Sequence, residues 1–331
     1  MRSLFLILFV ILSTIGFSQE KDNESKVEWN GYAQIRASSN LDDNTSFMLR
    51  RMKLWLKSTP GFSNHWSYKI QAIITSFQQE KFFLQDVKLN YKTGLFSFDI
   101  GQFVPQYSLQ WFQPDYKIPS IERAIAINLL VPDGSLGIRD IGIQANFETK
   151  NKFFKTHLGV FNGYGIKEYR FNNQGYMVTN KSEINIPIKN NKLKLGYSLQ
   201  YRYAQNLQLR HILPDTALFS GDDFRYNVFA MYKSKVLLFQ AEFLNAKLNN
   251  SNAYGYYFLS VINIKKNQIV LSFEKYKDLI VGTTNNPYYR IGYNYLIKDY
   301  KIKLSFDNYF QINNSKIDNY FGSIQLQLFF K

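Results

Sequence analysis

The sequence predicts an all-β fold: a closed antiparallel transmembrane β-barrel of about sixteen strands, with a long third loop folded into the lumen. Three observations indicate it: short segments that alternate apolar and polar residues, an aromatic content of 17%, and connectors that are short and long in turn. Between Ser323 and Phe330, Ile, Leu and Phe alternate with Ser and Gln. Such a strand has one apolar face and one polar face, as membrane barrels require. A barrel that is polar inside is typical of a channel.

The N-terminus predicts export. Arg2 precedes an apolar stretch from Leu4 to Ile15, and Gly16-Phe17-Ser18 places small residues at both positions that a signal peptidase reads. We therefore expect a cleavable signal peptide at 1–18, a flexible periplasmic leader at 19–26, and a barrel over 27–331. The predicted location is the bacterial outer membrane. The chain contains no cysteine, so disulfides and thiol chemistry are excluded.

Five alternating segments come first. In the segment after the first loop, Met52, Leu54 and Leu56 fall on one face, while the basic Arg51 and Lys53 fall on the other. Turn residues such as Thr59-Pro60-Gly61 and Lys92-Thr93-Gly94 separate the segments. The predicted strands are 29–36, 47–57, 66–74, 86–91 and 96–100.

The pattern stops over 104–136. This connector carries four prolines, which cannot donate to a β-ladder, so it is not a central strand. It is also rich in large apolar residues, including Trp111, Phe112 and Ile118, and would be more polar if it were a solvated loop. A long connector of this composition is usually functional. We expect it to pack against the barrel interior as a constriction loop.

Eleven further strands complete an even number, which closure of such a barrel requires. Short turns follow the even-numbered strands, and longer connectors follow most odd-numbered ones, namely 104–136, 162–177, 204–223, 245–255 and 277–288. This asymmetry is typical of barrels with periplasmic turns and outer loops. The predicted strands are 137–147, 153–161, 178–188, 193–203, 225–233, 236–244, 256–264, 269–276, 289–297, 300–309 and 320–330.

Several short motifs together resemble the phosphate-selective porin O and P family. They are Leu49-Arg50-Arg51-Met52-Lys53-Leu54, Ile100-Gly101-Gln102-Phe103 with Pro105, Glu122-Arg123, Arg139-Asp140-Ile141-Gly142, Val160-Phe161-Asn162-Gly163, Gln240-Ala241-Glu242 and Gly292-Tyr293-Asn294-Tyr295. The resemblance implies a trimeric sixteen-stranded porin with its third loop in the pore. It also implies anion preference, with phosphate or polyphosphate as solutes. One departure is that Lys331 follows the terminal aromatic residues, on which bacterial barrels usually end.

The net charge of +15 supports two interpretations. A basic lumen would concentrate anions, or lysines such as Lys265 and Lys266 merely solvate turns. By strand parity, the candidates for pore lining and anion binding are Arg36, Arg51, Lys53, Lys69, Arg202, Arg225 and Arg290, with Lys117 and Arg123 on the connector. Arg139, Asp140 and Glu242 are candidates for ion pairs that brace the wall.

Catalysis is not expected. The three histidines have no metal-ligand spacing, and no hydrolase or phosphate-loop motif is present. No cofactor or metal is expected. Nucleic-acid binding is not expected either, since the basic residues are scattered. The sequence thus favours an outer-membrane porin: a passive channel, leaning to anions such as phosphate or polyphosphate, with membrane lipid and a homotrimer as its partners. The alternatives are a non-selective nutrient barrel, a secreted glycan-binding β-sandwich and, least favoured, a barrel-embedded lipid hydrolase.

Overall fold

The computed structural model describes residues 25–40, 44–75, 81–131, 139–166, 176–209, 211–281, 285–313 and 316–330. The signal peptide, most of the leader, residues 132–136 of the predicted loop and Lys331 lie outside these ranges. No helix in the described part of the chain is long and apolar enough to span a membrane. The described residues form the helix α2 (Ile125–Leu130) and the strands β1 (Lys26–Asn40), β2 (Thr45–Thr59), β3 (Trp66–Thr75), β4 (Lys81–Thr93), β5 (Phe96–Phe103), β6 (Asp140–Glu148), β7 (Phe154–Phe161), β8 (Met177–Ile188), β9 (Asn191–Leu207), β10 (Phe219–Lys233), β11 (Leu237–Leu248), β12 (Ser251–Ile264), β13 (Asn267–Lys277), β14 (Tyr288–Tyr300), β15 (Ile302–Asn313) and β16 (Lys316–Phe330).

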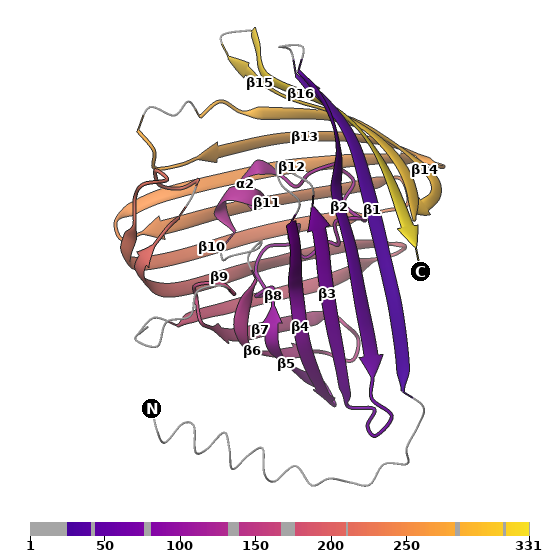
Figure 1. The fold of residues 1–331 in the computed structure, drawn as a ribbon, viewed down its shortest axis with the longest axis vertical. Helices are drawn as coiled ribbons and strands as arrows, with labels where there is room; N and C mark the ends of the chain where they lie inside the picture. Colours follow the sequence, from indigo (N-terminus) through magenta and orange to yellow (C-terminus); the bar gives the residue numbers. More distant parts are fainter. Residues whose placement is uncertain are drawn as a thin grey trace.

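These strands close into one antiparallel barrel in which every strand pairs with its neighbours in sequence and β1 pairs with β16 (Figure 1). The closing register sets Gly31 opposite Phe330 and Ala37 opposite Ile324. Closure satisfies every strand edge, as a hydrocarbon environment demands. The predicted sixteen-stranded barrel is confirmed, and the alternative of a secreted β-sandwich is wrong.

The two faces alternate as the sequence predicted. In β1, Trp29 and Ile35 are exposed on the outside, while Tyr32 and Gln34 are almost fully buried on the inside. The same alternation recurs in β16, where Ile324 and Leu328 are exposed and Gln325 and Gln327 are buried. Apolar residues therefore cover the exterior.

One predicted connector is wrong. Residues 245–255 are not a long outer loop, because β11 and β12 continue until only Asn249 and Asn250 separate them. Residues beyond Leu244 keep the alternation, with Ala246 and Leu248 buried and Lys247 exposed. The strands are longer than predicted because alternation persists through polar residues, which the sequence pattern had assigned to the loop.

A β-bulge explains the pair of adjacent arginines in β2. The register shifts so that Gln34 faces Arg51 and Ile35 faces Leu49, which leaves Arg50 as the extra residue. A bulge turns the extra side chain away from strict alternation. Arg50 therefore reaches the interior beside Arg51, where an unbulged strand would have placed it on the lipid face.

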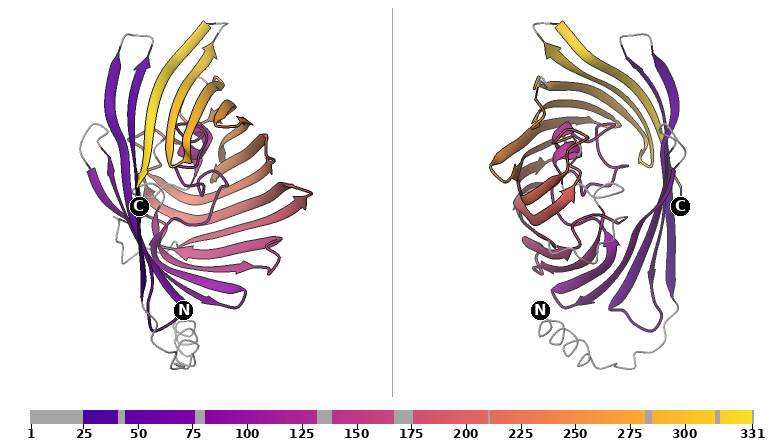
Figure 2. Two further views of the ribbon diagram at one scale, coloured as in Figure 1. Left: turned by 90° about the vertical axis from the view of Figure 1, so that its right-hand side faces the viewer. Right: turned by 60° about the vertical axis from the view of Figure 1, so that its left-hand side comes forward.

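The described part of the predicted loop, 104–131, packs against inward-facing side chains. Figure 2 shows α2 within the ring of strands, and it contacts β11, β12 and β13. Its buried Ile127 and Leu130 belong to an apolar cluster with Leu244, Tyr257 and Val261 of those strands. The interior of the barrel is thus not uniformly polar. Strand β12 can be apolar on both faces, because α2 shields its inner face from water.

Candidate functional site

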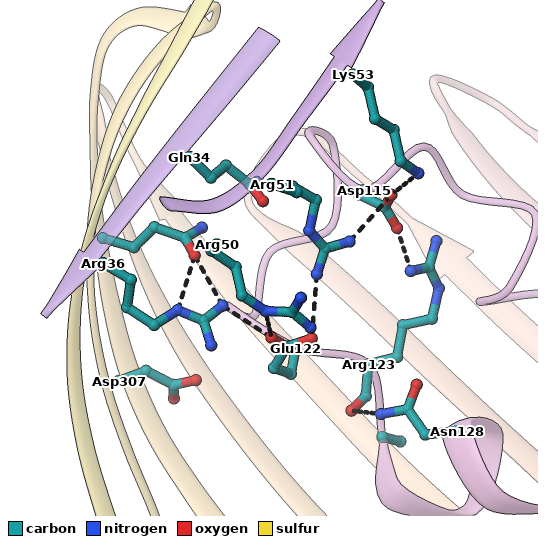
Figure 3. A network of polar contacts seen from close by, with 12 residues as sticks. Gln34, Arg36, Arg50, Arg51, Lys53, Asp115, Glu122, Arg123, Asn128 and Asp307 are labelled. Carbon is teal, nitrogen blue, oxygen red and sulfur yellow. Dashed lines mark hydrogen bonds and ion pairs between the residues drawn. The ribbon is translucent and has the colours of Figure 1, made fainter. Parts of the chain in front are cut away.

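A cluster of cations surrounds Glu122 (Figure 3). One carboxylate oxygen, Oε1, accepts hydrogen bonds from Arg36 Nη2 at 2.8 Å and Arg50 Nε at 2.6 Å. The other, Oε2, accepts one from Arg51 Nη2 at 3.3 Å. The arginines come from β1 and β2, and the bulge at Arg50 brings the third of them into reach. Glu122 therefore ties the loop to the first two strands.

Asp115 is a second anchor on the same loop. It pairs with Arg51 Nη1 at 3.1 Å and with Lys53 and Arg123 at closer range. The Tyr32 hydroxyl donates to the same carboxylate at 3.1 Å. Asp115 and Glu122 thus face five cations, Arg36, Arg50, Arg51, Lys53 and Arg123, and the cluster keeps a positive excess.

The surrounding cations stabilise both loop carboxylates in their charged form. Burial alone would raise the pKa of Glu122, but Arg51, Arg50 and Arg36 outweigh it, and the pKa lies well below its usual range. Burial would likewise raise the pKa of Asp115, yet nearby Arg123, Lys53 and Arg51 hold that pKa far below its ordinary value. Both anchors are therefore ionised at any physiological pH.

Inward-facing side chains of the other strands, from β8 round to β16, hold the loop by its backbone. Glu242 accepts hydrogen bonds from the backbone N–H groups of Leu109 and Gln110, at 2.8 and 2.7 Å. Lys303 donates to the Ile118 carbonyl at 2.9 Å, and Arg290 donates to that of Glu122 at 2.7 Å. Further contacts of this kind join Lys181 to Ser108, Glu274 to Ile125, Asn294 to Pro119, Gln327 to Tyr116 and Arg225 to Leu130.

Two cavities that share lining residues lie on the β2–β7 side, among the described residues. The larger, of about 860 Å³, opens at the end of the barrel where turns follow even-numbered strands, and the smaller, of about 270 Å³, lies beside the loop. Lys69, Lys88 and Asp99 line both. The larger cavity is lined by eight lysines, Lys26, Lys57, Lys69, Lys88, Lys92, Lys150, Lys152 and Lys155, and by three carboxylates, Glu28, Asp99 and Glu148. It therefore carries a strong positive excess.

The predicted site residues fall into three groups in the structure. Lys53, Lys69 and Arg123 line the smaller cavity, whereas Lys117 is exposed beside the Tyr116 ring. The remaining five are almost fully buried in ion pairs or against the loop: Arg36, Arg51, Arg202, Arg225 and Arg290. All five lie on the inner face that strand parity assigns to them. The loop contacts Arg36, Arg51, Arg225 and Arg290, which parity could not predict, whereas Arg202 contacts Asp223 and the Gly163 carbonyl.

The predicted bracing residues are each held by specific contacts. Arg139 Nε lies 2.8 Å from Asp86, which also pairs with Lys69. Asp140 accepts a hydrogen bond from the Gly163 backbone at 2.8 Å. Glu242, besides binding the loop, accepts one from the Tyr257 hydroxyl at 2.8 Å.

Sequence reasoning missed three members of the site: Arg50, Asp115 and Glu122. Strict parity puts Arg50 on the lipid face, but two successive arginines in a membrane strand would then place one in lipid, and the cost of that placement indicates a bulge. Glu122 contributed only to the family resemblance. Asp115 was missed because its role depends on a long-range contact. In the described part of the chain, no group of His, Cys, Asp or Glu is arranged to hold a metal.

Comparison with known proteins gives a family and a fold. The family model described as phosphate-selective porin O and P matches residues 27–261. No curated protein matches. Among solved structures, the fold is similar to Salmonella typhi OmpF in complex with daunomycin, with a TM-score of 0.66 and 10% identity over 95% of this chain and 100% of that one.

Two other structures have the same fold. Pseudomonas putida OprB has a TM-score of 0.65 and 9% identity, covering 92% of this chain and 94% of its own. In-vitro folded OmpT, an outer-membrane protein of Vibrio cholerae in its trimer form, has a TM-score of 0.63 and 11% identity, covering 93% and 100%. At these identities the likeness concerns the fold alone.

Proposed function

This chain belongs to the phosphate-selective porin O and P family, and from that premise we propose that it is an outer-membrane channel through which small anions diffuse passively. It acts as a pore and not as an enzyme. The closed barrel supports the pore, and the lining of the open cavities supports the selectivity.

The observation that carries the anion preference is the lysine excess of the larger cavity. Its eight lysines face three carboxylates across a space of about 860 Å³. A cleft lined by one sign of charge, with low-dielectric walls, focuses the field and raises the local concentration of ions of opposite charge. Anions are therefore enriched at this mouth.

The loop determines where these anions pass. Residues 104–131 cover the inner faces of β11–β13 and pair with β1 and β2, so they narrow the lumen to the β2–β7 side. There, Lys53, Lys69, Lys88, Arg123 and Arg139 line the smaller cavity. Arg36 and Arg51 act indirectly, because they hold the loop in place.

Phosphate or polyphosphate is the solute class that this lining fits best within the family. Several flexible ammonium groups on separate strands offer point charges to a multivalent anion. We also propose a homotrimer in the outer membrane, since OmpT, which shares this fold, is known in a trimer form.

The test is a reversal-potential measurement on single channels in planar bilayers, in a tenfold salt gradient. An anion-selective reversal potential is expected, together with a single-channel conductance that added phosphate lowers through block. A preference for cations would overturn the proposed anion selectivity, but the proposal that the protein is a channel would stand. Absence of any conductance from correctly folded protein would overturn the channel itself.

A non-selective nutrient channel is the second candidate. The smaller cavity favours it, because its three carboxylates all lie against cations: Asp86 on Lys69 and Arg139, Asp99 on Lys88, and Asp115 on Lys53 and Arg123. Paired charges cancel much of each other's field. A reversal potential of zero would select this candidate.

A further inference from the structure

A patch of cations lies on the outer face of the barrel, where its side chains point away from the lumen. Lys247 of β11 points outward because Ala246 and Leu248 on either side of it face the interior. Lys275 and Lys277 of β13 point outward because Glu274 and Tyr276 face the interior. By contrast, the outward positions that β1 presents beside β16 are Gly31, Ala33, Ile35 and Ala37. On a surface that contacts only hydrocarbon, three lysines would be destabilising.

The register gathers these lysines among aromatic rings. Across β11, β12 and β13, one row holds Asn245, Tyr254 and Lys277, and the next holds Phe243, Tyr256 and Lys275. The Lys277 ammonium lies 5.9 Å from the centre of the Tyr254 ring. Lys247 lies two positions before the Asn249–Asn250 turn, which places the patch near the rim of the barrel.

That position corresponds to the headgroup zone of a membrane. Aromatic girdles mark the interfaces of such barrels, and the cost of a cation on the lipid face falls from the midplane towards the interface. Lysines there interact with the anionic headgroups of lipids. An outward carboxylate of the adjacent strand, Asp222 of β10, accepts a hydrogen bond from the Tyr201 hydroxyl at 2.8 Å.

A second observation points to a ligand. Asn245 faces outward in the same patch, yet it is only 8% exposed, and its Oδ1 has no hydrogen-bond partner among the described residues. A buried acceptor of this kind is costly unless it is satisfied. A phosphate group acts almost entirely as an acceptor at neutral pH, so a hydroxyl or an amide N–H of the ligand is the donor that fits Asn245.

We propose that Lys247, Lys275, Lys277 and Asn245 form a binding site for a phosphate-bearing glycolipid of the membrane leaflet at this rim. The lysines bind the phosphate groups, a sugar hydroxyl or amide donates to Asn245 Oδ1, and the acyl chains lie along the outward rings of β11–β13. The site is independent of the pore, and the channel does not require it.

The experiment uses the full mature chain in detergent, titrated with diphosphoryl lipid A or with phosphatidylcholine, and complexes are quantified by native mass spectrometry. The variant Lys247→Gln/Lys275→Gln/Lys277→Gln is compared with Lys235→Gln/Lys265→Gln/Lys266→Gln, which removes the same charge from turns at the opposite end. Folding is checked by heat-modifiable gel mobility. Asn245→Leu tests the acceptor separately.

We expect wild type and the turn variant to bind lipid A equally, and the patch variant to bind about a hundredfold more weakly, as three surface lysines acting together imply. Asn245→Leu should weaken binding severalfold. Equal binding by the two triple variants, or equal retention of phosphatidylcholine by wild type, would overturn the site. So would a patch variant that keeps lipid A but dissociates an oligomer, since the patch would then be a subunit contact.

Discussion

Glu122 shows how much one side chain contributes to the architecture of this pore. Its carboxylate joins arginines of β1 and β2, and its own carbonyl accepts from Arg290 on β14. Residues far apart in sequence therefore meet at one point. Cations that strand parity assigns to the pore hold the loop instead, which leaves lysines as most of the basic side chains that line the two cavities.

Removing this carboxylate should destabilise the protein. We expect Glu122→Ala to lower the free energy of unfolding by about 3 kcal/mol, because it leaves Arg36, Arg50 and Arg51 without their shared partner. That is the lower end of the range for a broken buried ion pair, since the Glu122 side chain remains 31% exposed. Urea unfolding of the protein in lipid bilayers measures it. Glu28→Ala, at an exposed position of β1, is the control, and an equal loss in both variants would contradict the anchoring role.

The pH dependence of the loop follows from the depressed pKa values of Asp115 and Glu122. A carboxyl group whose pKa is lower when folded stabilises the fold above its unfolded pKa, and that stability is lost as the pH falls towards the folded value. We therefore expect the loop to resist proteolysis equally from pH 7 to about pH 5, and to loosen only below about pH 4. Loosening near pH 6 would show that other groups control the loop.

At the scale of elements, β12 and α2 determine each other. The inward positions of β12 carry Ala253, Gly255, Tyr257, Leu259 and Val261, an apolar face that water would not tolerate. Helix α2 covers it, and Gly255 permits the approach, since a Cβ at this position would lie 2.7 Å from that of Ala126. A strand that is apolar on both faces thus indicates, already in sequence, an element packed inside the barrel.

A larger residue at this contact should displace the helix. Gly255→Leu is expected to fold into a barrel but to expose Arg123–Leu130 to protease, because its side chain overlaps Ala126 and the Lys275 carbonyl. Limited proteolysis followed by mass spectrometry locates the cut. Ser260→Leu, at an outward position of the same strand, is the control. Protection equal to wild type in Gly255→Leu would contradict the close contact.

Deleting much of the loop should widen the channel. With residues 110–130 replaced by a short Gly-Ser linker, single-channel conductance is expected to rise severalfold, because the loop fills the β11–β13 side of the interior. Heat-modifiable mobility confirms assembly of the barrel. Unchanged conductance in an assembled variant would mean that the loop does not limit the current.

At the scale of the whole molecule, selectivity depends on how cavity charges sum. We expect Lys69→Gln/Lys88→Gln to reduce anion preference more than Lys265→Gln/Lys266→Gln, because only the first pair lines both cavities. Wild-type preference should also weaken as salt rises, since screening acts over about 10 Å at 0.1 M. Reversal potentials at 0.1 M and 1 M salt measure both effects. Equal effects of the two variants would mean that the cavity lysines influence selectivity no more than lysines at the surface turns.

The sequence by itself determined the barrel, its sixteen strands, their faces and the position of the long loop, because strand alternation and proline content are local properties of the chain. It did not determine that β11 and β12 form a tight hairpin, that Arg50 turns inward, or that Asp115 and Glu122 gather five cations. Only the tertiary structure decided which inward cations meet the loop and which meet solvent. Parity specifies a face, whereas the partner on that face comes from residues distant in sequence, and closure of the barrel brings them together.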